Sequence, residues 1–341
     1  VDALKFNTTG SGNLAVGGHA LQANTTASHN TAVGKEALYN NTTGSYNVAV
    51  GRYALDANTT ASSNTAVGYH ALGACTTAIT GAVAIGYEAF YRLTTGSHNL
   101  AIGHQAGDHY TSTSDTTLVG YNAGTAGTTG ECNTIVGSHA FIAATTAANN
   151  TGVGHAALNA VTTGNNNTAV GRLALLLVTT GIENVAMGAG AGDTITTGSN
   201  NVCLGYNAEP ASATTNTSVT LGNSQINSLR CNTTSISSLS DARDKTDVED
   251  LPTGVEFINK LHPVKFKWQR RTPDTNDGTI RAGFIAQELQ EAQKGNEYLN
   301  LVLEDNPDKL EATPGNLIPV FVKAIQELST EVEQLKSQLN N

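Results

Sequence analysis

One glycine returns along most of the chain at a nearly constant interval, and this repeat constrains the fold more than any other feature. It closes the pattern Asn-x-Ala-Val-Gly, and successive copies are 17 residues apart, with one step of 18. Such a regular period indicates an architecture in which each short unit packs on its two neighbours. The recurring glycines are Gly17, Gly34, Gly51, Gly68, Gly86, Gly103, Gly120, Gly137, Gly154, Gly171, Gly188, Gly205 and Gly222.

The composition of one period favours strands and turns over helix. Each period contains a glycine, several β-branched residues and usually a Thr-Thr pair such as Thr42-Thr43, and these residues are poor helix formers. We therefore expect a mainly β fold, a parallel β-solenoid or β-roll of about 13 coils with a 17-residue period. At a strand spacing of ~4.8 Å the rod would be about 60 Å long. The recurring asparagines, such as Asn13 and Asn30, should form a ladder.

Two positions in each period carry the apolar side chains. The residue before each glycine is aliphatic or Met, and the third residue after it is nearly always Ala, as Val33 and Ala37 show for Gly34. We expect both positions to face the core. One thin coil buries too little apolar surface to offset an ordering cost of about 1.5 kcal/mol per residue. We therefore expect the chains to share an alanine-rich face, with three chains as the natural number.

The composition changes near residue 239. Glycine is concentrated before this point, whereas charged residues are concentrated after it. We expect a repeat shaft over residues 1–226, a connector over 227–239 and a separate domain over 240–341 that is a small α+β unit.

The last domain shows strand and helix patterns. Val264, Phe266 and Trp268 alternate with lysines, which predicts a half-buried strand. After Pro314 the pattern becomes helical, and six apolar residues are spaced 4-3-4-3-4. This spacing supplies a coiled-coil seam for self-association, and the alternative is an amphipathic helix docked on its own domain. The six residues are Phe321, Ile325, Leu328, Val332, Leu335 and Leu339.

Charge and cysteine usage exclude several classes of function. The net charge of −10 argues against wrapping nucleic acid or an anionic membrane surface. No run of 18 apolar residues exists, so we expect no membrane insertion, and the chain opens without a signal segment. Free, mostly packed thiols are expected, because no CxxC pair occurs among Cys75, Cys132, Cys203 and Cys231.

Other polar features of the repeats favour a structural or surface role, and we expect neither a cofactor nor a metal site. The histidines lie in different coils without metal-ligand spacing. The segment from Gly188 to Gly192 has the glycine pattern of a dinucleotide-binding loop, but it is not flanked by a βαβ unit. The Thr pairs either close turns or present a hydroxyl ladder for ice or glycan. Tyrosines such as Tyr69 either stack on sugars or are ordinary surface residues.

The repeats resemble a known family. Copies such as Asn30-Thr31-Ala32-Val33-Gly34 are similar to the head repeats of trimeric autotransporter adhesins over roughly residues 13–226. The resemblance implies a left-handed parallel β-roll and a trimer.

The last domain resembles the endosialidase-type intramolecular chaperone domain. In that family the domain ends phage tail fibres and tailspikes, trimerises, folds the β-rich stalk before it and cuts itself off at the Ser of an S-D-x-R-x-K motif. The resemblance implies cleavage between Leu239 and Ser240. The four motifs that carry it are SDARDK at 240–245, LHPVKF at 261–266, GFIAQE at 283–288 and KAIQEL at 323–328.

The chemistry of this motif places requirements on two residues. The Ser240 hydroxyl is a weak nucleophile, and Lys245 can act as its base only when neutral. Lowering a Lys pKa from about 10.4 to near 7 costs about 4–5 kcal/mol, which needs desolvation or a nearby cation. Arg243 is the candidate cation and Asp241 would oppose it. Positions 240 and 245 can meet only across a bend or between chains, and the alternative is that Ser240 caps a turn.

These patterns predict the distal part of a homotrimeric viral tail fibre or tailspike that attaches to a host. The predicted partner is a host cell-surface receptor, with glycans among the candidates, and no nucleic acid. The predicted locations are the virion tail and, during assembly, the host cytoplasm. The predicted activity is single-turnover self-cleavage by a Ser240–Lys245 dyad without an external substrate. The alternatives are a bacterial trimeric adhesin head-like surface protein without catalytic activity and a carbohydrate-active enzyme with paired carboxylates.

Overall fold

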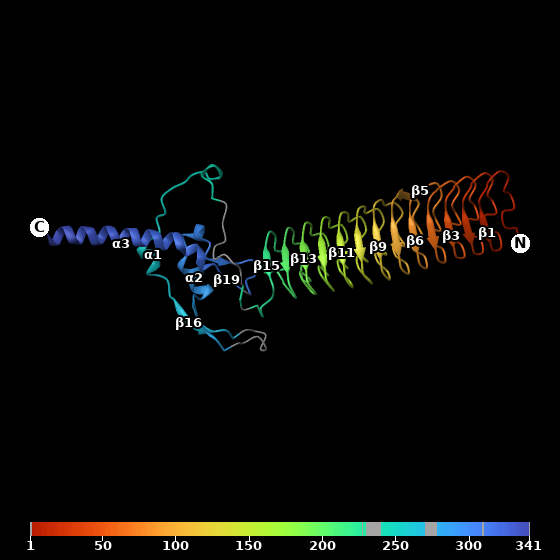
Figure 1. Cartoon of the computed structure of the whole chain (residues 1–341). Coiled ribbons are helices and arrows are strands. Elements are labelled where there is room, and N and C mark those ends of the chain that lie inside the picture. The colour runs from red at the N-terminus through yellow and green to blue at the C-terminus, as the bar shows by residue number, and fades with distance from the viewer. Residues whose placement is uncertain (1, 227, 230–239, 270–277, 309, 341) are drawn as a thin grey trace. The chain divides into compact units, whose positions relative to one another are not determined.

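The chain divides into two compact units, which we describe separately. The structure is a computed structural model that describes residues 2–226, 228–229, 240–269, 278–308 and 310–340. Unit 1 is Val1–Asn223 and unit 2 is Ser224–Asn341 (Figure 1). Most of the predicted connector, 227–239, lies outside the described residues.

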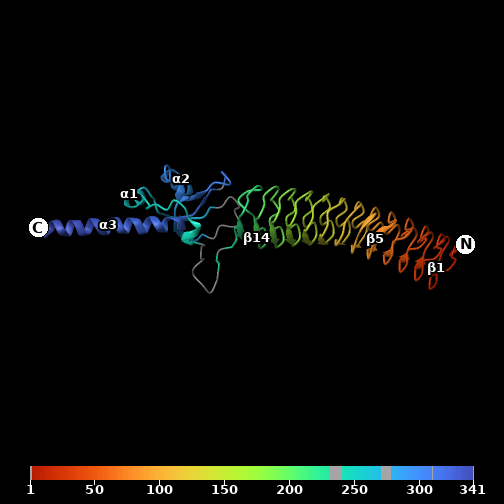
Figure 2. The same cartoon turned by 90° about the horizontal axis from the view of Figure 1, so that it is seen from above.

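Unit 1 is a parallel β-solenoid, which confirms the predicted fold class. Each coil contributes one three-residue strand to a 13-stranded sheet, and the coils stack in register (Figures 1 and 2). Leu14 pairs with Thr31, and the 18-residue step falls between Thr65 and Val83. The strands of this sheet are β1 (Leu14–Val16), β2 (Thr31–Val33), β3 (Val48–Val50), β4 (Thr65–Val67), β6 (Val83–Ile85), β8 (Leu100–Ile102), β9 (Thr117–Val119), β10 (Thr134–Val136), β11 (Thr151–Val153), β12 (Thr168–Val170), β13 (Val185–Met187), β14 (Val202–Leu204) and β15 (Val219–Leu221).

A second, two-stranded sheet is formed on the loops of two neighbouring coils. Strand β5 (Ala78–Thr80) pairs in parallel with β7 (Thr95–Ser97). Counted from the Thr-Thr pairs, the extra residue of the 18-residue step lies in the loop that contains β5. The insertion is therefore absorbed in a loop, and the register of the large sheet is kept.

The two apolar positions predicted to face the core behave differently. Ala37 and the following Leu38 are fully buried, as predicted. The residue before each glycine was wrongly predicted to face the core: Val16 is 52% exposed and Met187 is 49% exposed. Side chains alternate along a strand, so the middle residue of each strand, such as Ala32, points inward and its two neighbours point outward. The alanines fill the interior of each coil, and the predicted sharing of an alanine-rich face between chains is also wrong.

The predicted asparagine ladder is confirmed. The backbone N–H of Asn30 donates to Oδ1 of Asn13 at 2.9 Å, and that of Asn47 donates to Oδ1 of Asn30 at 2.8 Å. Nδ2 of Asn30 donates to the carbonyl of Gly44 at 2.9 Å. Each fully buried carboxamide therefore pairs with backbone groups of the next coil, and the Gly44 carbonyl also accepts from Nδ2 of Asn41 at 2.9 Å.

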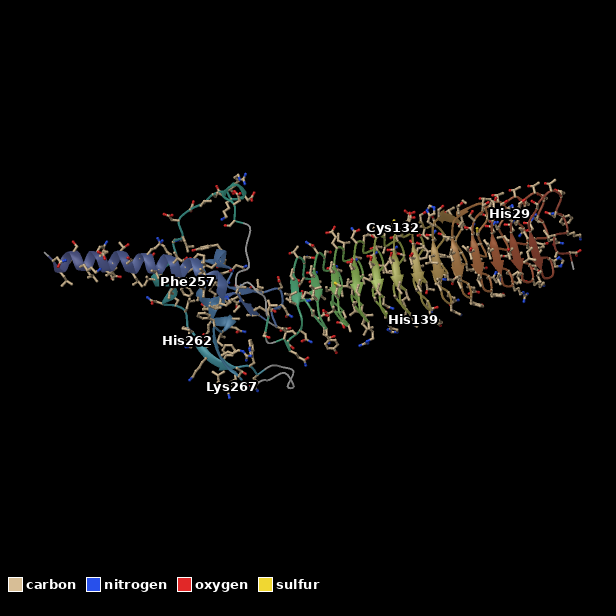
Figure 3. All side chains as sticks on the ribbon, viewed as in Figure 1. His29, Cys132, His139, Phe257, His262 and Lys267 are labelled. Atoms are coloured by element: carbon tan, nitrogen blue, oxygen red, sulfur yellow. The ribbon has the colours of Figure 1, made fainter. Side chains whose placement is uncertain are left out.

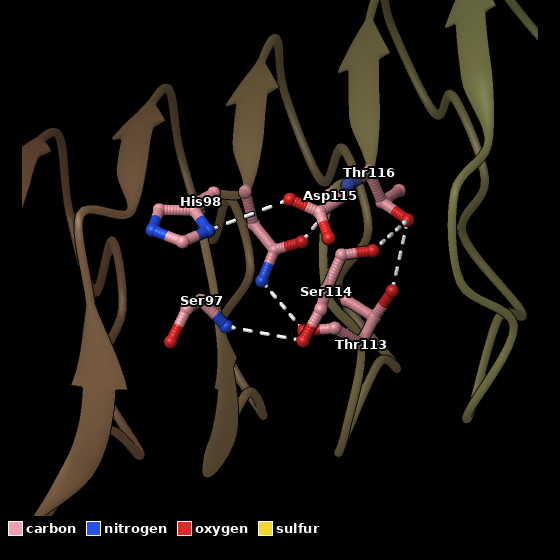
Figure 4. A network of polar contacts seen from close by, with 7 residues as sticks. Ser97, His98, Thr113, Ser114, Asp115 and Thr116 are labelled. Carbon is pink, nitrogen blue, oxygen red and sulfur yellow. Dashed lines mark hydrogen bonds and ion pairs between the residues drawn. The ribbon is translucent and has the colours of Figure 1, made fainter.

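Two threonines replace the asparagine in one coil (Figure 4). Thr116 stands at the ladder position, and its hydroxyl lies 2.9 Å from the hydroxyl of Thr113. The Thr116 hydroxyl accepts from the N–H of Asn133 at 3.4 Å, and the Thr113 hydroxyl donates to the Gly130 carbonyl at 2.7 Å. Together the two hydroxyls perform the acceptor and donor roles of one carboxamide, whereas Ala82, at the ladder position of another coil, has no side-chain group for either role.

A second column of buried side chains, one from each coil, is polar in the first coils and apolar in the later ones. Asn41 donates to Oδ1 of Asn24 at 3.1 Å, and Asn58 donates to Asn41 at 2.7 Å. Cys75 takes the next position, and its thiol lies 3.7 Å from Oδ1 of Asn58. Burial raises the pKa of the Cys75 thiol to about 12, so it remains a neutral donor at physiological pH. In the following coils apolar residues such as Leu93 fill the same column.

The turns of neighbouring coils are joined by hydroxyls and by close backbone approach. The first Thr of a pair donates to a carbonyl of the next coil, as Thr42 does to Thr59 at 3.0 Å, so this hydroxyl links neighbouring coils instead of closing its own turn. Gly103 has a φ of +139°, and a methyl group at this position would overlap the Gly120 carbonyl oxygen. The recurring glycine is therefore required both by its dihedral angles and by the approach of the next coil.

Unit 2 is a small α+β unit. Its core contains Phe257, Leu289, Leu301, Leu317 and Val320. The predicted strand is confirmed for β16, in which Val264 and Phe266 are half-buried and the lysines are exposed. Trp268, which was expected to continue the apolar face, lies after the end of the strand and is 47% exposed. The elements are η1 (Ala242–Asp244), α1 (Val255–Ile258), β16 (Val264–Lys267), β17 (Ile280–Gly283), α2 (Ala286–Ala292), η3 (Glu297–Leu299), β18 (Val302–Leu303), β19 (Glu311–Ala312), η4 (Pro314–Leu317) and α3 (Ile318–Leu339).

Helix α3 has two different apolar faces. Val320 and Ala324 are buried in unit 2, so the helix docks on its own unit through these residues. The predicted seam is exposed in the single chain: Ile325 is 66% exposed and Leu335 is 51% exposed. The seam residues therefore remain free for another partner.

Replacing the recurring glycine should disrupt the stack. We expect Gly103→Ala to lower the free energy of unfolding of unit 1 by about 3 kcal/mol or more, because the methyl group meets the next coil and φ is positive. Gly18→Ala is the matched control, since nothing lies within 4 Å of its Cβ position, and it should change stability by less than about 1 kcal/mol. Denaturant unfolding followed by circular dichroism measures both; equal effects would contradict the close-approach explanation.

Removing one ladder carboxamide should also destabilise unit 1. Asn47→Ala leaves the N–H of Asn64 without its acceptor, whereas the carbonyl of Ala61 loses one of two donors and keeps Nδ2 of Asn58. At about 1–3 kcal/mol per unpaired buried group we expect a loss of about 1–3 kcal/mol. The control is Thr43→Ala, which removes an exposed side chain of a nearby turn and should be nearly neutral. A melting temperature of Asn47→Ala equal to that of the control would show that the ladder does not stabilise the fold.

Candidate functional site

The Ser240 and Lys245 side chains meet across a single tight turn. Asp241 is extended, Ala242–Asp244 form the short 3-10 helix η1, and Lys245 is extended again. This turn brings Nζ of Lys245 to 2.6 Å from Oγ of Ser240, and the ammonium donates to the hydroxyl. Of the two arrangements that the sequence left open, the structure therefore shows the bend within one chain.

Asp241 and Arg243 form an ion pair within the same turn. Nη2 of Arg243 lies 2.6 Å from Oδ2 of Asp241, and Nε donates to Oδ1 at 3.0 Å. The hydrogen bonds from Arg243 lower the pKa of the Asp241 carboxyl, and the same contact raises the pKa of Arg243. Asp241 also accepts from the backbone N–H of Arg243 at 2.9 Å and thereby caps the turn. Asp241 thus fixes the geometry of the turn and compensates the charge of Arg243.

The site is open to solvent in the single chain. All residues from 240 to 250 are exposed, and in Figure 1 the loop that carries η1 stands away from helices α1 and α2. Leu239, the other residue of the predicted scissile bond, lies outside the described residues. Among the residues that the structure describes, none therefore provides the desolvation that a neutral lysine requires.

Two of the other sequence motifs are joined in the body of unit 2. Val264 pairs with Gly283 where β16 and β17 form an antiparallel ladder. Nδ1 of His262 lies 3.0 Å from Oε2 of Glu288; His262 is labelled in Figure 3. The motifs at 261–266 and 283–288 thus lie together around the β16–β17 ladder. Neither motif has a hydrogen bond or ion pair with Ser240 among the described residues.

The fourth motif contributes a helix cap that sequence reasoning missed. Oε2 of Glu327, on α3, accepts from the backbone N–H of Val255 at 2.8 Å, at the start of α1. Gly254 leaves the room for this carboxylate, because a side chain at position 254 would overlap it. The only signal in the sequence is a glycine just before a short apolar segment, and nothing there indicates which acidic residue, 72 residues away, supplies the cap.

Other predicted features can be placed among the described residues. Cys75 and Cys203 are buried and Cys132 is exposed, whereas Cys231 lies outside the described residues. No group of three or more His, Cys, Asp or Glu side chains in the described part of the chain is placed to hold a metal ion. No helix over the same residues has the length and apolar character needed to cross a membrane.

The comparison with protein families agrees with this geometry. Residues 240–298 match the family described as the chaperone of endosialidase. The match begins at Ser240, the residue that Lys245 contacts. It covers most of unit 2 before β18, and it leaves unit 1 and α3 outside. No curated protein and no solved structure matches the chain.

Proposed function

We propose that this chain is the distal part of a homotrimeric viral tail fibre or tailspike, and that its C-terminal unit is an intramolecular chaperone that releases itself after assembly. The family match at residues 240–298 supports the chaperone role. The observation that carries the release step is the 2.6 Å contact between Nζ of Lys245 and Oγ of Ser240. The fibre reaches a receptor on the host surface as part of the virion tail, after assembly in the host cytoplasm.

The proposed release is an acyl shift followed by hydrolysis. Oγ of Ser240 attacks the carbonyl carbon of Leu239, while Lys245 accepts the hydroxyl proton. The bond from this carbon to the Ser240 nitrogen breaks, and Lys245 returns the proton to the leaving amine. The resulting ester between Leu239 and Ser240 is hydrolysed by one water molecule, which gives a carboxylate at Leu239 and a free amine on Ser240.

Association of the chains would control this chemistry. Lys245 donates to Ser240 as an ammonium, whereas a base must accept from the hydroxyl. Because the turn is exposed among the described residues of one chain, we assign the burial that favours a neutral amine to neighbouring chains. Cleavage would then follow assembly, and a chain that has not associated would keep its chaperone.

The outer face of the 13-stranded sheet supports association of the shaft. Its outward residues are the first and third of each strand, and all of them are aliphatic, Met or Thr, with no charged residue in either row. A strip ~60 Å long and roughly 10 Å wide covers about 600 Å², the upper limit for the largest apolar patch of a typical monomer. Because the same residues recur in every coil, the face is uniform enough to pack against copies of itself, and we assign it to the trimer interface.

The exposed seam of α3 supports association at the other end of the sequence. Phe321, Ile325 and Leu328 begin a run with coiled-coil spacing, and they are exposed in the single chain. Copies of α3 would bury this seam while Val320 and Ala324 hold each helix on its own unit. Nucleation at α3 would bring three shafts together before their sheets pack.

The release step predicts a defined change in fragment pattern. We expect the parent chain to yield fragments 1–239 and 240–341, the second beginning at Ser240, and we expect Ser240→Ala to remain intact. Lys245→Ala should slow cleavage by about a hundredfold or more, the range of a general base. Thr246→Ala is the control and should cleave normally. Denaturing gels and intact mass measure this.

The outcomes of this experiment separate the proposals. Fragments of unchanged size from Ser240→Ala would refute the dyad. An intact parent chain that is trimeric would refute self-release and retain the chaperone role. It would also favour the adhesin-like alternative, which has no catalytic activity.

The sheet interface predicts a change in oligomeric state. We expect Val136→Lys to reduce the trimer to smaller species, because three charges would be buried at a cost of several kcal/mol each. Thr146→Lys lies in an exposed turn and should leave the trimer intact. Light scattering gives the mass, and circular dichroism checks that the coils persist. A trimeric Val136→Lys chain would show that the interface lies elsewhere.

A further inference from the structure

One face of the β16–β17 sheet in unit 2 is exposed and basic. Side chains alternate along each strand, and the exposed residues of the two strands are Lys265, Lys267, Ile280 and Ala282. Lys265 pairs with Ala282 and Lys267 pairs with Ile280, so these side chains share one face. Lys267 is labelled in Figure 3. We call these four residues the basic face.

The basic face has no partner in the single chain. Neither lysine forms an ion pair with another described residue, and Ile280 is 62% exposed. Within the described ranges the sheet has only two strands, and an isolated pair of strands is marginally stable in water. The core of unit 2 and the side chains packed against it include no described residue of either strand. A second chain that covers this face would therefore stabilise the sheet.

The segment at 247–250 has the complementary character. Its residues are Asp247, Val248, Glu249 and Asp250, and all four are exposed. Val248 is 77% exposed. The three carboxylates form no ion pair among the described residues. An apolar side chain between acidic neighbours thus corresponds to a face on which an apolar side chain lies beside lysines.

The two surfaces do not meet within one chain. No hydrogen bond or ion pair joins them among the described residues, and in Figure 1 the loop that carries 247–250 and strand β16 lie on opposite sides of α3. Two different surfaces that complement each other give a heterologous contact, in which one surface of a copy meets the other surface of the next copy. Such contacts close into a ring when the rotation between copies allows it.

We propose that the basic face of one copy docks on residues 247–250 of the next copy, with Ile280 against Val248 and the lysines on the carboxylates. The inference rests on the proposed function, because it names the contact through which association acts on Ser240 and Lys245. Three copies joined in this way form a closed ring. A nucleic acid or an anionic surface is the alternative occupant of the basic face, and the net charge of −10 disfavours both.

Docking changes the surroundings of the cleavage turn. Lys245 lies two residues before Asp247, so a neighbouring copy that covers 247–250 also excludes water close to the turn. The carboxylates of this segment favour the charged form of a nearby lysine, and the lysines of the neighbouring copy offset them. Both effects favour the neutral amine that the release step requires.

Crosslinking tests the contact independently of cleavage. Val248→Cys and Ile280→Cys are combined in the Ser240→Ala chain, and the exposed Cys132 is removed by Cys132→Ser. A disulfide requires Cβ atoms about 3.5–4.5 Å apart, so we expect mild oxidation to give covalent dimers and trimers on non-reducing gels. Chains with either introduced cysteine alone are the controls and should give neither. Disulfides confined to single chains, products that stop at dimers, or no disulfide in a chain that light scattering shows to be trimeric would overturn the inference.

Charge reversal tests the same contact through cleavage. Lys265→Glu combined with Lys267→Glu should slow self-release about tenfold or more, because like charges then face each other. Asp247→Lys with Glu249→Lys should also slow it, whereas a purely local effect of two cations beside Lys245 would speed it. All four substitutions in one chain restore opposite charges and should bring the rate within about threefold of the parent rate.

The matched control reverses two exposed lysines of unit 2 outside the basic face, Lys260→Glu with Lys294→Glu. It makes the same change in net charge as the variant of the basic face and should cleave at the parent rate. Circular dichroism checks the fold of every variant. Equal slowing by the control, or no recovery in the fourfold variant, would overturn the inference. A parent chain that is monomeric would overturn both proposals, and covalent trimers of the cysteine variant beside an uncleaved parent chain would refute self-release alone.

Discussion

The hydrogen bonds that run from coil to coil determine the architecture of unit 1. In a coil this thin the interior contains backbone groups as well as alanine and leucine side chains, and the carboxamides of residues such as Asn30 and Asn47 pair them along the stack. Where Thr113 and Thr116 replace one asparagine, two hydroxyls reproduce the same pairings. The coils are stacked in register, so corresponding residues of successive coils lie above one another, which makes the apolar face of the 13-stranded sheet continuous.

The period of the repeat was sufficient to predict the solenoid, but not which apolar row faces inward. Val33 is larger and more hydrophobic than Ala32, so hydrophobicity alone favoured the wrong residue. In a three-residue strand the flanking residues share one face and the middle residue takes the other, and Ala37 beside the strand already indicated a narrow interior. Composition alone cannot distinguish an apolar row on the outer face of a strand from an apolar row that faces the core.

The candidate site was predictable in its residues and not in its surroundings. Spacing restricted Ser240 and Lys245 to a bend or to a contact between chains, and the turn capped by Asp241 provides the bend. The pairing of Arg243 with Asp241 could not be deduced, because Arg243 is flanked by two acidic residues, Asp241 and Asp244, and the sequence does not indicate which of them it contacts. The cap that Glu327 places on Val255 depends on the tertiary approach of α3 to α1, about which a local pattern contains no information.

The 18-residue step has a consequence for how such a shaft can change in length. The single extra residue falls in the loop that contains β5, and the strands on either side keep their pairing. Gain or loss of a whole 17-residue unit would likewise preserve every contact between neighbouring coils and lengthen or shorten the rod by one step of ~4.8 Å. The length of the solenoid can therefore change in steps of one coil, by duplication or deletion of 17-residue units, without changes to the sequence at either end of it.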